Sequence, residues 1–239
     1  MKPYYEDNLT TLYHADCEEV IPLIDEVDLV FTSPPYNMSG DNNSPTGTYF
    51  RNLDGGYVEY NDSMPHEEYV AWQHKIVRLL YNALSETGAV YYNHKPLVRG
   101  NQAKLPTELV PEDVPLRQII IWDRGSGFNR QFTYYVPTQE WILMLAKPDF
   151  RINTRSINDI WKIPFETNND HPAPFPLSLP AMAIETTSPK KVLDPFAGSG
   201  TTLVAAKSAG IKSIGVEMSE RNCEMAANRL AQGSLFDGF

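Results

Sequence analysis

Cysteine is scarce in this sequence, and long apolar segments are absent from it. The two cysteines, Cys17 and Cys223, have no metal-site or redox-site spacing, so we expect both to be packing residues in a protein of the reducing cytoplasm. The longest apolar run, Trp141 to Ala146, has six residues, far fewer than a membrane-spanning helix needs. The first residues lack the pattern of a signal peptide. These absences argue against a secreted disulfide-rich protein and against a membrane protein.

Basic residues are also in the minority. Lys and Arg number 20 against 30 Asp and Glu, a net charge of −10, which argues against a protein that binds nucleic acid through charge alone. The charge is uneven, however, because residues 117–162 carry 7 basic and 4 acidic side chains whereas residues 1–116 carry 7 and 18. The middle segment is therefore a candidate for contact with an anionic partner, and chance clustering on a solvated face is the alternative.

What is present is typical of one globular α/β domain. At 239 residues and 42% hydrophobic, the chain can bury one sizeable core, and we predict a single domain over residues 1–239. Two predicted strands, 116–123 and 139–147, are joined by a short link and should pair antiparallel. A helix is predicted over 64–84. The pattern predicts a doubly wound, mostly parallel, seven-stranded sheet with one antiparallel hairpin and helices on both faces. The other predicted strands are 9–16, 27–31, 88–92, 192–193 and 214–216.

A glycine-rich turn, Asp194-Pro-Phe-Ala-Gly-Ser-Gly-Thr-Thr202, lies in the last quarter of the chain. A strand precedes it, a helix follows it, and a second strand closes with Glu217, which is the outline of a nucleotide-binding βαβ unit. A dinucleotide site would need a third glycine where Leu203 stands, and a P-loop would need a lysine where Thr201 stands. Asp194 would suit a cationic sulfonium and an amino group better than a phosphate. The alternative is an ordinary strand-to-helix turn.

A second motif, Thr32-Ser33-Pro34-Pro35-Tyr36, follows a buried strand. Two prolines cannot continue a sheet ladder, so the chain leaves the sheet there, at the carboxyl edge where open α/β sheets bind ligands. The amine of a nucleobase is a weak nucleophile that needs acceptors for its hydrogens, and Ser33 Oγ and the Pro34 carbonyl could supply them. Tyr36 could stack on a base swung out of a duplex. The alternative is a motif that only terminates the strand.

Together the two motifs resemble those of amino-group DNA methyltransferases, in which Ser/Asp/Asn-Pro-Pro-Tyr catalyses and Asp-Pro-Phe-x-Gly-Ser-Gly-Thr binds S-adenosylmethionine. The catalytic motif comes some 160 residues before the cofactor motif here, which looks like the permuted β class of that family. A His-Pro-Ala-x-Phe-Pro segment and an Asp-bearing segment are also present, so the resemblance spans nearly the whole chain. It implies a Rossmann-like methyltransferase fold with a circularly permuted motif order.

The resemblance also implies the site residues. The catalytic motif would be Ser33, Pro34, Pro35 and Tyr36. Within the cofactor site Glu217 would hold the ribose hydroxyls, and no metal is required. The S-adenosylmethionine site would comprise Asp16, Cys17, Thr32, His171, Phe175, Pro176, Asp194, Phe196, Ala197, Gly198, Ser199, Gly200, Thr201, Thr202, Glu217 and Met218.

Double-stranded DNA is the partner that the resemblance implies. The recognition insert at about 148–170 is short, so we expect help from a substrate loop at about 37–64 and from residues 124–130. Aromatic residues interleave with arginines there, a composition suited to backbone contact and stacking. The resemblance also allows a homodimer and a cognate restriction endonuclease. The predicted DNA contacts are Arg124, Arg130, Lys147, Arg151 and Arg155, with Phe128, Phe132, Tyr134 and Tyr135 beside them.

The function implied is that of a site-specific DNA methyltransferase acting on the N4 amine of cytosine by base flipping, because Ser-Pro-Pro-Tyr goes mostly with cytosine in the resembling class. The N6 amine of adenine is the alternative. Families that methylate RNA or protein glutamine place the cofactor motif first, and a non-catalytic DNA-binding module would have lost Ser33, Tyr36 or Asp194. A C5-cytosine mechanism is disfavoured because neither cysteine follows a proline.

Overall fold

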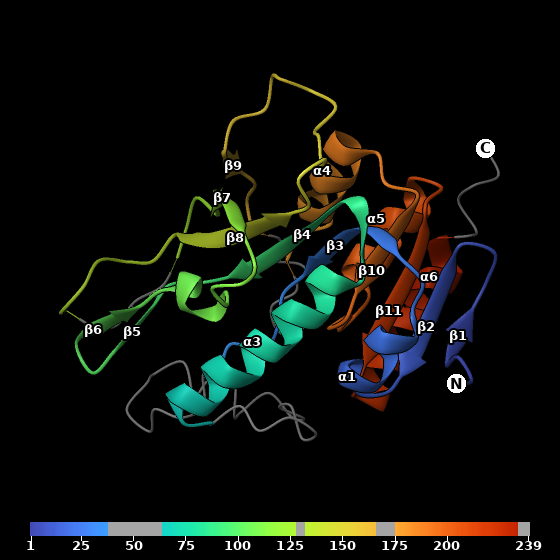
Figure 1. Ribbon diagram of the computed structural model, residues 1–239, viewed down its shortest axis with the longest axis horizontal. Helices are drawn as coiled ribbons and strands as arrows, with labels where there is room; N and C mark the ends of the chain where they lie inside the picture. Colours follow the sequence, from blue (N-terminus) through green and yellow to red (C-terminus); the bar gives the residue numbers. More distant parts are fainter. Residues whose placement is uncertain (38–63, 128–131, 166–174, 234–239) are drawn as a thin grey trace.

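The computed structural model describes residues 1–37, 64–127, 132–165 and 175–233 (Figure 1). The strands are β1 (Tyr5–Glu6), β2 (Thr10–His14), β3 (Val27–Thr32), β4 (Leu84–His94), β5 (Leu97–Arg99), β6 (Gln102–Lys104), β7 (Leu116–Asp123), β8 (Gln139–Ala146), β9 (Ile160–Lys162), β10 (Lys191–Asp194) and β11 (Lys212–Glu217). The helices are α1 (Cys17–Val20), α3 (His66–Asn82), α4 (Ser178–Thr187), α5 (Thr201–Ser208) and α6 (Glu220–Gly233), with short 3₁₀ turns η1 (Ile21–Leu23) and η2 (Pro106–Leu109).

The described strands form one nine-stranded sheet in the order β1-β2-β11-β10-β3-β4-β8-β7-β9, and β5 pairs with β6 separately. Strands β2, β11, β10, β3 and β4 are mutually parallel, whereas β8 runs antiparallel to both β4 and β7. The predicted doubly wound sheet and its antiparallel hairpin are therefore confirmed. Two short edge strands, β1 and β9, add to the seven predicted ones. Their two and three residues are too few to show a hydrophobic period.

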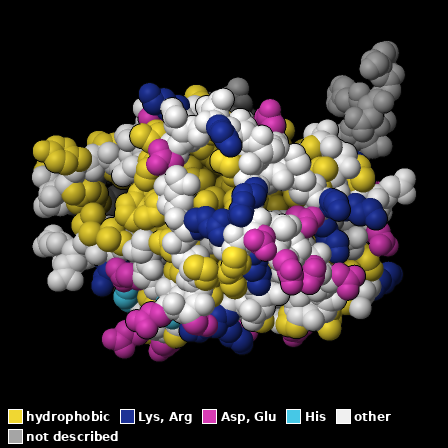
Figure 2. Space-filling model, turned by 45° about the horizontal axis from the view of Figure 1, so that its top comes forward, with side chains coloured by type: hydrophobic (Ala, Val, Ile, Leu, Met, Phe, Trp, Pro, Cys, Tyr) yellow, Lys and Arg dark blue, Asp and Glu magenta, His cyan; other side chains and the backbone are white. Residues whose placement is uncertain are grey.

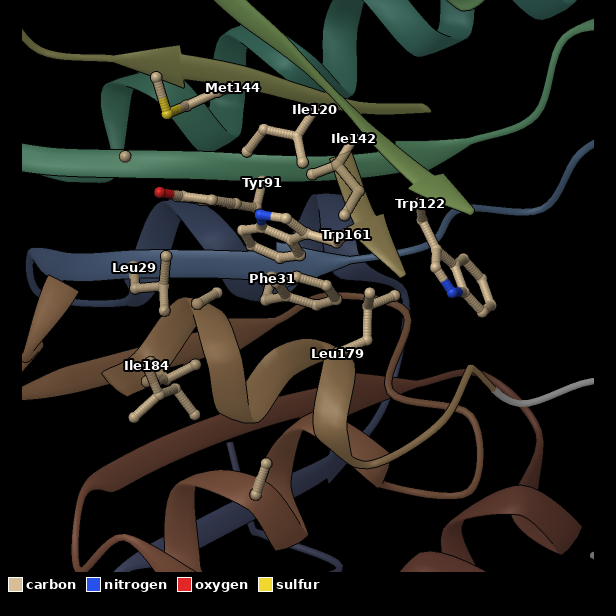
Figure 3. Close-up of a cluster of buried hydrophobic side chains, with 14 of the residues drawn as sticks. Leu29, Phe31, Tyr91, Ile120, Trp122, Ile142, Met144, Trp161, Leu179 and Ile184 are labelled. Atoms are coloured by element: carbon tan, nitrogen blue, oxygen red, sulfur yellow. The ribbon is translucent and has the colours of Figure 1, made fainter. Parts of the chain in front are cut away.

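Helices cover both faces because successive residues of the buried strands point to opposite sides. Leu29 and Phe31 of β3 pack in one core with residues of α4 and α5, whereas Val30 packs in a second core with residues of α3. Figure 3 shows the first core, where Leu179 and Ile184 of α4 face the sheet. Residues 27–31 are apolar apart from Asp28, and this is why they were predictable as a buried strand.

A third core lies between β2, α5 and α6 and contains one of the two cysteines. Cys223 is completely buried there, in contact with a cluster that includes Leu12 and Leu203. Cys17 is buried in the core on the α3 side, where burial raises the pKa of its thiol. Both cysteines are therefore packing residues, as expected. In the part of the chain that the structure describes, no helix combines the length and the apolarity needed to cross a membrane.

The sheet topology brings five strand ends to one edge. The unit β10–α5–β11 extends to one side of β10, and the unit β3–α3–β4 extends to the other side. The carboxyl ends of these parallel strands, together with that of β2, therefore meet at one edge of the sheet. The direction of strand order changes between β10 and β3, and open α/β sheets bind their ligands at such a point. These ends carry His14, Thr32, His94, Asp194 and Glu217.

Gly200, at the start of α5, should tolerate no side chain. Its φ is +80°, and a Cβ there would lie 2.9 Å from Cβ of Ala226 in α6. We expect Gly200→Ala to lower the free energy of unfolding by about 2–5 kcal/mol, combining left-handed strain with overpacking. Gly210→Ala is the matched control, because Gly210 has a φ of +70° with no atom within 4 Å and should lose only about 1–2 kcal/mol. If urea unfolding showed the same loss of unfolding free energy for both variants, α6 would have shifted to make room for the added methyl group.

Candidate active site

The two motifs predicted from the sequence are joined by a buried hydrogen bond. Thr32 Oγ1, at the end of β3, donates to Asp194 Oδ1, at the end of β10, over 2.7 Å. The backbone N–H of Phe196 donates to the same carboxylate oxygen over 3.2 Å. Thr202 Oγ1 donates to the carbonyl of Phe31 over 3.2 Å, which ties α5 to β3. Residues 162 positions apart thus fix the glycine-rich turn beside the Ser-Pro-Pro-Tyr motif.

Asp194 is a buried carboxyl whose protonation is sensitive to its surroundings. Burial raises the pKa of Asp194 from 3.8 to about 6, hydrogen bonds from Thr32 and the Phe196 N–H oppose this rise, and the charge of Glu217 adds to it. A carboxylate held in a buried position gains from a nearby cation, because a cation stabilises its charged form. Asp194 is therefore suited to hold a positively charged group of a ligand.

The glycine-rich turn leaves room next to Gly198, whose N–H bonds the carboxylate of Glu217. Gly198 has a φ of +52°, and the position that a Cβ would take has no neighbouring atom closer than 4.0 Å. The Gly198 N–H donates to Glu217 Oε2 over 2.8 Å, and Ser219 N and Asn222 Nδ2 donate to Oε1 over 2.8 and 3.3 Å. A carboxylate accepts about four hydrogen bonds, so Glu217 can also accept one from a ligand.

Arg229 of α6 supports the same turn from behind, a role that the sequence analysis missed. Its Nη1 donates to the carbonyl and the Oγ of Ser199, over 2.8 and 2.9 Å, and to Thr201 Oγ1 over 3.2 Å. The sequence contains only a weak indication of this role of Arg229. Arg229 precedes the buried Leu230, but a single arginine on an amphipathic helix is usually solvated.

The remaining predicted cofactor residues border this space from neighbouring elements. Strand β2 pairs with β11, with His14 opposite Glu217, and so carries Asp16 to the same edge, where its Oδ1 caps α1 by accepting from Glu18 N over 2.8 Å. The Met218 carbonyl lies 2.9 Å from His14 Nε2, and the Met218 side chain is exposed.

Two phenylalanines of the predicted cofactor site pack against the cores. The Phe196 ring lies 5.8 Å from that of Trp72, and the Phe175 ring lies 5.4 Å from that of Phe31, both edge to face. Pro176 and Ala197 are buried beside them. His171 lies outside the described residues.

These groups fit S-adenosylmethionine. Asp194 and Glu217 end adjacent strands, and two carboxylates there match a ligand with a cationic sulfonium, a cationic amino group and ribose hydroxyls. Gly198 leaves the room that a close backbone approach requires. A diphosphate would be repelled by the same two carboxylates.

The catalytic motif belongs to a cluster of polar groups. Ser33 Oγ lies 2.6 Å from Tyr36 Oη, and Tyr36 Oη donates to Glu140 Oε2 over 3.0 Å. Asn93 Nδ2 donates to Tyr36 Oη and to Glu140 Oε2, over 2.9 and 2.8 Å. Arg124 pairs with the other oxygen, Glu140 Oε1, over 3.1 Å. Hydroxyls from the β3 end therefore meet a carboxylate of β8 and an amide of β4.

Glu140 and Asn93 were not predicted from the sequence, although the sequence around each contained an indication. Glu140 precedes the apolar run from Trp141, and Asn93 ends one that begins at Ala89. Both side chains are buried, and buried charged or amide groups need partners. Asn93 Oδ1 is buried and accepts no hydrogen bond within the described part of the chain.

Backbone and ring contacts fix the orientation of the motif. Tyr69 Oη donates to the carbonyl of Pro35 over 2.7 Å, whereas the carbonyl of Pro34 accepts nothing from the described residues. The Tyr36 ring lies 4.3 Å from that of His94, tilted by 43°. Burial lowers the pKa of His94 to about 3, so this imidazole is neutral at ordinary pH. Ser33 Oγ and the Pro34 carbonyl are thus the two motif oxygens that we expect to meet a substrate.

The predicted DNA-contacting residues are scattered. Arg124 already bonds Glu140 and the carbonyl of Pro137, over 3.1 and 2.8 Å. Because β8 runs antiparallel to β4, Lys147 and Arg151 lie at the opposite edge of the sheet, roughly 17 Å along the strands from the catalytic motif. Arg155 is exposed in the connection to β9. Arg130 and Phe128 lie outside the described residues, as do most of the loop at 37–64 and the end of the insert at 148–170.

Comparisons with known proteins agree with this geometry. A family model described as "DNA methylase", N6_N4_Mtase, matches residues 27–228. The type II methyltransferase M.ScaI of Streptomyces caespitosus is 27% identical over 96% of this chain and 84% of its own length. The structure of a DNA modification methylase from Thermus thermophilus, complexed with S-adenosyl-L-methionine, is 25% identical, covers 95% of each chain and has a TM-score of 0.68. The cytosine-N4-specific PvuII DNA methyltransferase, 18% identical over 98% and 93% of the two chains, has a TM-score of 0.76 and shares the fold.

The raised pKa of Asp194 predicts a dependence of stability on pH. Because the folded-state pKa of about 6 exceeds the unfolded value near 3.8, the folded state holds the proton more tightly. Asp194 therefore favours folding below pH 4, and this contribution is lost as the pH rises to about 6. The free energy of unfolding of the wild type, minus that of Asp194→Asn, should fall by on the order of 3 kcal/mol between pH 4 and 7.

Urea unfolding at constant ionic strength measures this difference. Asp149→Asn, at an exposed position, controls for the loss of one charge. A difference that stays flat with pH would mean that the Asp194 carboxylate is already as stable in the folded chain as in water.

Proposed function

This chain belongs to the N6/N4 DNA methylase family, and on that premise we propose that it is a site-specific DNA methyltransferase acting on the N4 amine of cytosine. The observation that carries the proposal is the buried hydrogen bond between Thr32 and Asp194, which holds a carboxylate next to the motif that supplies two acceptor oxygens. The carboxylate suits a cationic methyl donor, and the acceptors suit an amine. Methyl transfer needs both within one site.

S-adenosylmethionine supplies a methyl group on a positively charged sulfur. Asp194 and Glu217 would hold its charged and hydroxyl groups, Gly198 would let the backbone approach it, and Phe175 and Phe196 would flank it. The Thr32–Asp194 bond orients the Asp194 carboxylate, so that the bound cofactor faces the end of β3.

The motif residues act on the amine. Ser33 Oγ and the Pro34 carbonyl each accept one of its hydrogens, which withdraws the nitrogen lone pair from the ring and directs it toward the methyl group. His94 supports one side of the Tyr36 ring, and the exposed part of that ring is a platform for a base that has left the duplex. Glu140, Asn93 and the Tyr69–Pro35 hydrogen bond keep the motif rigid.

The identity of the base rests on Ser33. A serine at this position goes mostly with N4-cytosine in the resembling class, and an aspartate goes mostly with N6-adenine. A hydroxyl is a weaker acceptor than a carboxylate, and no physical argument ties it to cytosine. The N6 amine of adenine is the second candidate, because the family model covers methylases of both amines.

The DNA duplex would approach the half of the molecule that carries β7 and β8. Figure 2 shows hydrophobic side chains gathered on that half of one face, whereas charged side chains gather on the other half. Phe132 and Tyr135, in the link from β7 to β8, are almost completely exposed. The link starts beside Arg124, which is paired with Glu140, and this supports a role for its aromatic rings in stacking on bases or filling the space that a flipped base would leave.

We also propose a biological setting of the restriction–modification type. The chain would work in the cytoplasm with duplex DNA as its substrate, and a cognate restriction endonuclease and a second copy of this chain are the protein partners that the family suggests.

Methyl transfer from labelled S-adenosylmethionine to duplex DNA, RNA and protein, measured side by side, tests the substrate class. Only duplex DNA should be labelled, and nucleoside mass spectrometry of that DNA should give N4-methylcytosine. Ser33→Ala should lower turnover by about 10²–10³-fold while the Kd for the cofactor changes little, because its contact strengthens as the amine becomes tetrahedral. Methyladenine without methylcytosine would overturn the choice of base, and labelling of RNA or protein alone would overturn the substrate class.

A further inference from the structure

A carboxylate lies at the end of a chain of hydroxyl groups that begins at Ser33. The phenol of Tyr36 has one hydrogen, and it donates that hydrogen to Glu140 Oε2. Tyr36 Oη must therefore accept in its other contacts, from Asn93 Nδ2 over 2.9 Å and from Ser33 Oγ over 2.6 Å. The hydroxyl hydrogen of Ser33 consequently points at Tyr36. Ser33 Oγ also accepts a long hydrogen bond from Asn93 Nδ2, over 3.5 Å, and keeps one lone pair for a substrate.

The surroundings of this chain maintain its direction. Burial raises the pKa of the Tyr36 phenol well above its usual value, and the charge of Glu140 raises it further, so the phenol keeps its hydrogen. Glu140 is almost completely buried and is paired with Arg124 through its other oxygen. Asn93 donates both to Tyr36 and to Glu140 and so holds the two at a fixed separation.

We propose that Glu140 is a positioning residue for methyl transfer, which acts through Tyr36 to make Ser33 a proton acceptor. This inference rests on the proposed function, because it concerns the same amine. A neutral serine hydroxyl is a weak acceptor by itself. A hydroxyl that donates into a chain ending in a buried carboxylate is polarised and accepts more strongly. The Ser33–Tyr36–Glu140 chain thus gives a serine motif part of the acceptor strength of an aspartate.

The proton balance of the reaction requires a proton acceptor, and the Ser33–Tyr36–Glu140 chain supplies one. The amine nitrogen forms a bond to the methyl carbon with its lone pair, and the sulfur keeps the electron pair of the bond that breaks. The nitrogen must then lose one proton. Ser33 Oγ takes this proton as its own hydrogen moves to Tyr36 Oη, and the hydrogen of Tyr36 moves to Glu140 Oε2. Glu140 ends as a neutral carboxylic acid and returns its proton to water after the product leaves.

Two near-isosteric substitutions test the chain. Glu140→Gln removes the proton acceptor and keeps the shape, and Tyr36→Phe removes the connecting hydroxyl and keeps the ring. We expect each to lower the single-turnover rate of methyl transfer to DNA by about 10–100-fold, with the Kd for S-adenosylmethionine within about threefold of the wild-type value. If Glu140 acts through Tyr36, the double variant should be no slower than the slower single variant.

The control is Glu86→Gln, an exposed glutamate of β4 far from the carboxyl edge, which should leave the rate unchanged. Thermal unfolding of every variant verifies that it is folded. Losses that multiply in the double variant, or a Glu140→Gln variant as fast as the wild type, would overturn the relay while leaving the proposed function intact. A wild-type protein that methylates no DNA would overturn the proposed function and the relay together.

Discussion

A single buried hydrogen bond, from Thr32 Oγ1 to Asp194 Oδ1, is the contact on which the rest of the site depends. A carboxylate at this depth is costly unless donors surround it, and Thr32 shares that role with the backbone N–H of Phe196. The donors are available because β3 and β10 are neighbours in the sheet, with Val192 opposite Leu29. The order of the two motifs along the chain is then unimportant, since the sheet restores their proximity. A permuted chain can therefore build the same site.

The carboxylates at this edge of the sheet fall into two groups with different proposed roles. Asp194 and Glu217 end the adjacent strands β10 and β11 and attract positive charge there, whereas Glu140 of β8 is balanced by Arg124. This division shows why overall charge is a poor guide to the ligand here. A net charge of −10 is compatible with a surface for DNA because the count includes Asp194 and Glu140, which are buried and contact protein donors.

The sequence predicted features that depend on local chemistry. Gly198 and Gly200 adopt positive φ in the turn that the motif indicates, and Pro34 and Pro35 end β3 as expected. Contacts between distant segments were not predictable in this way. Glu140 and Asn93 come together only because β8 inserts next to β4, and the antiparallel direction of β8 moves Lys147 to the far edge. Arg229 reaches Ser199 from a helix whose docking depends on the third core. These contacts depend on the tertiary packing, which cannot be predicted from a local pattern of residues.

The position of the target amine tests the central claim most directly. The claim is that Ser33 Oγ and the Pro34 carbonyl hold the amine beside a cofactor bound at Asp194 and Glu217. A crystal structure of the protein with S-adenosylhomocysteine and a duplex that contains the modified site would locate both. We expect a cytosine that lies outside the DNA duplex. Its N4 should lie within hydrogen-bonding distance, about 2.7–3.2 Å, of Ser33 Oγ and the Pro34 carbonyl oxygen, and it should face the cofactor sulfur. A base bound elsewhere, or a cofactor sulfur turned away from Ser33, would contradict it.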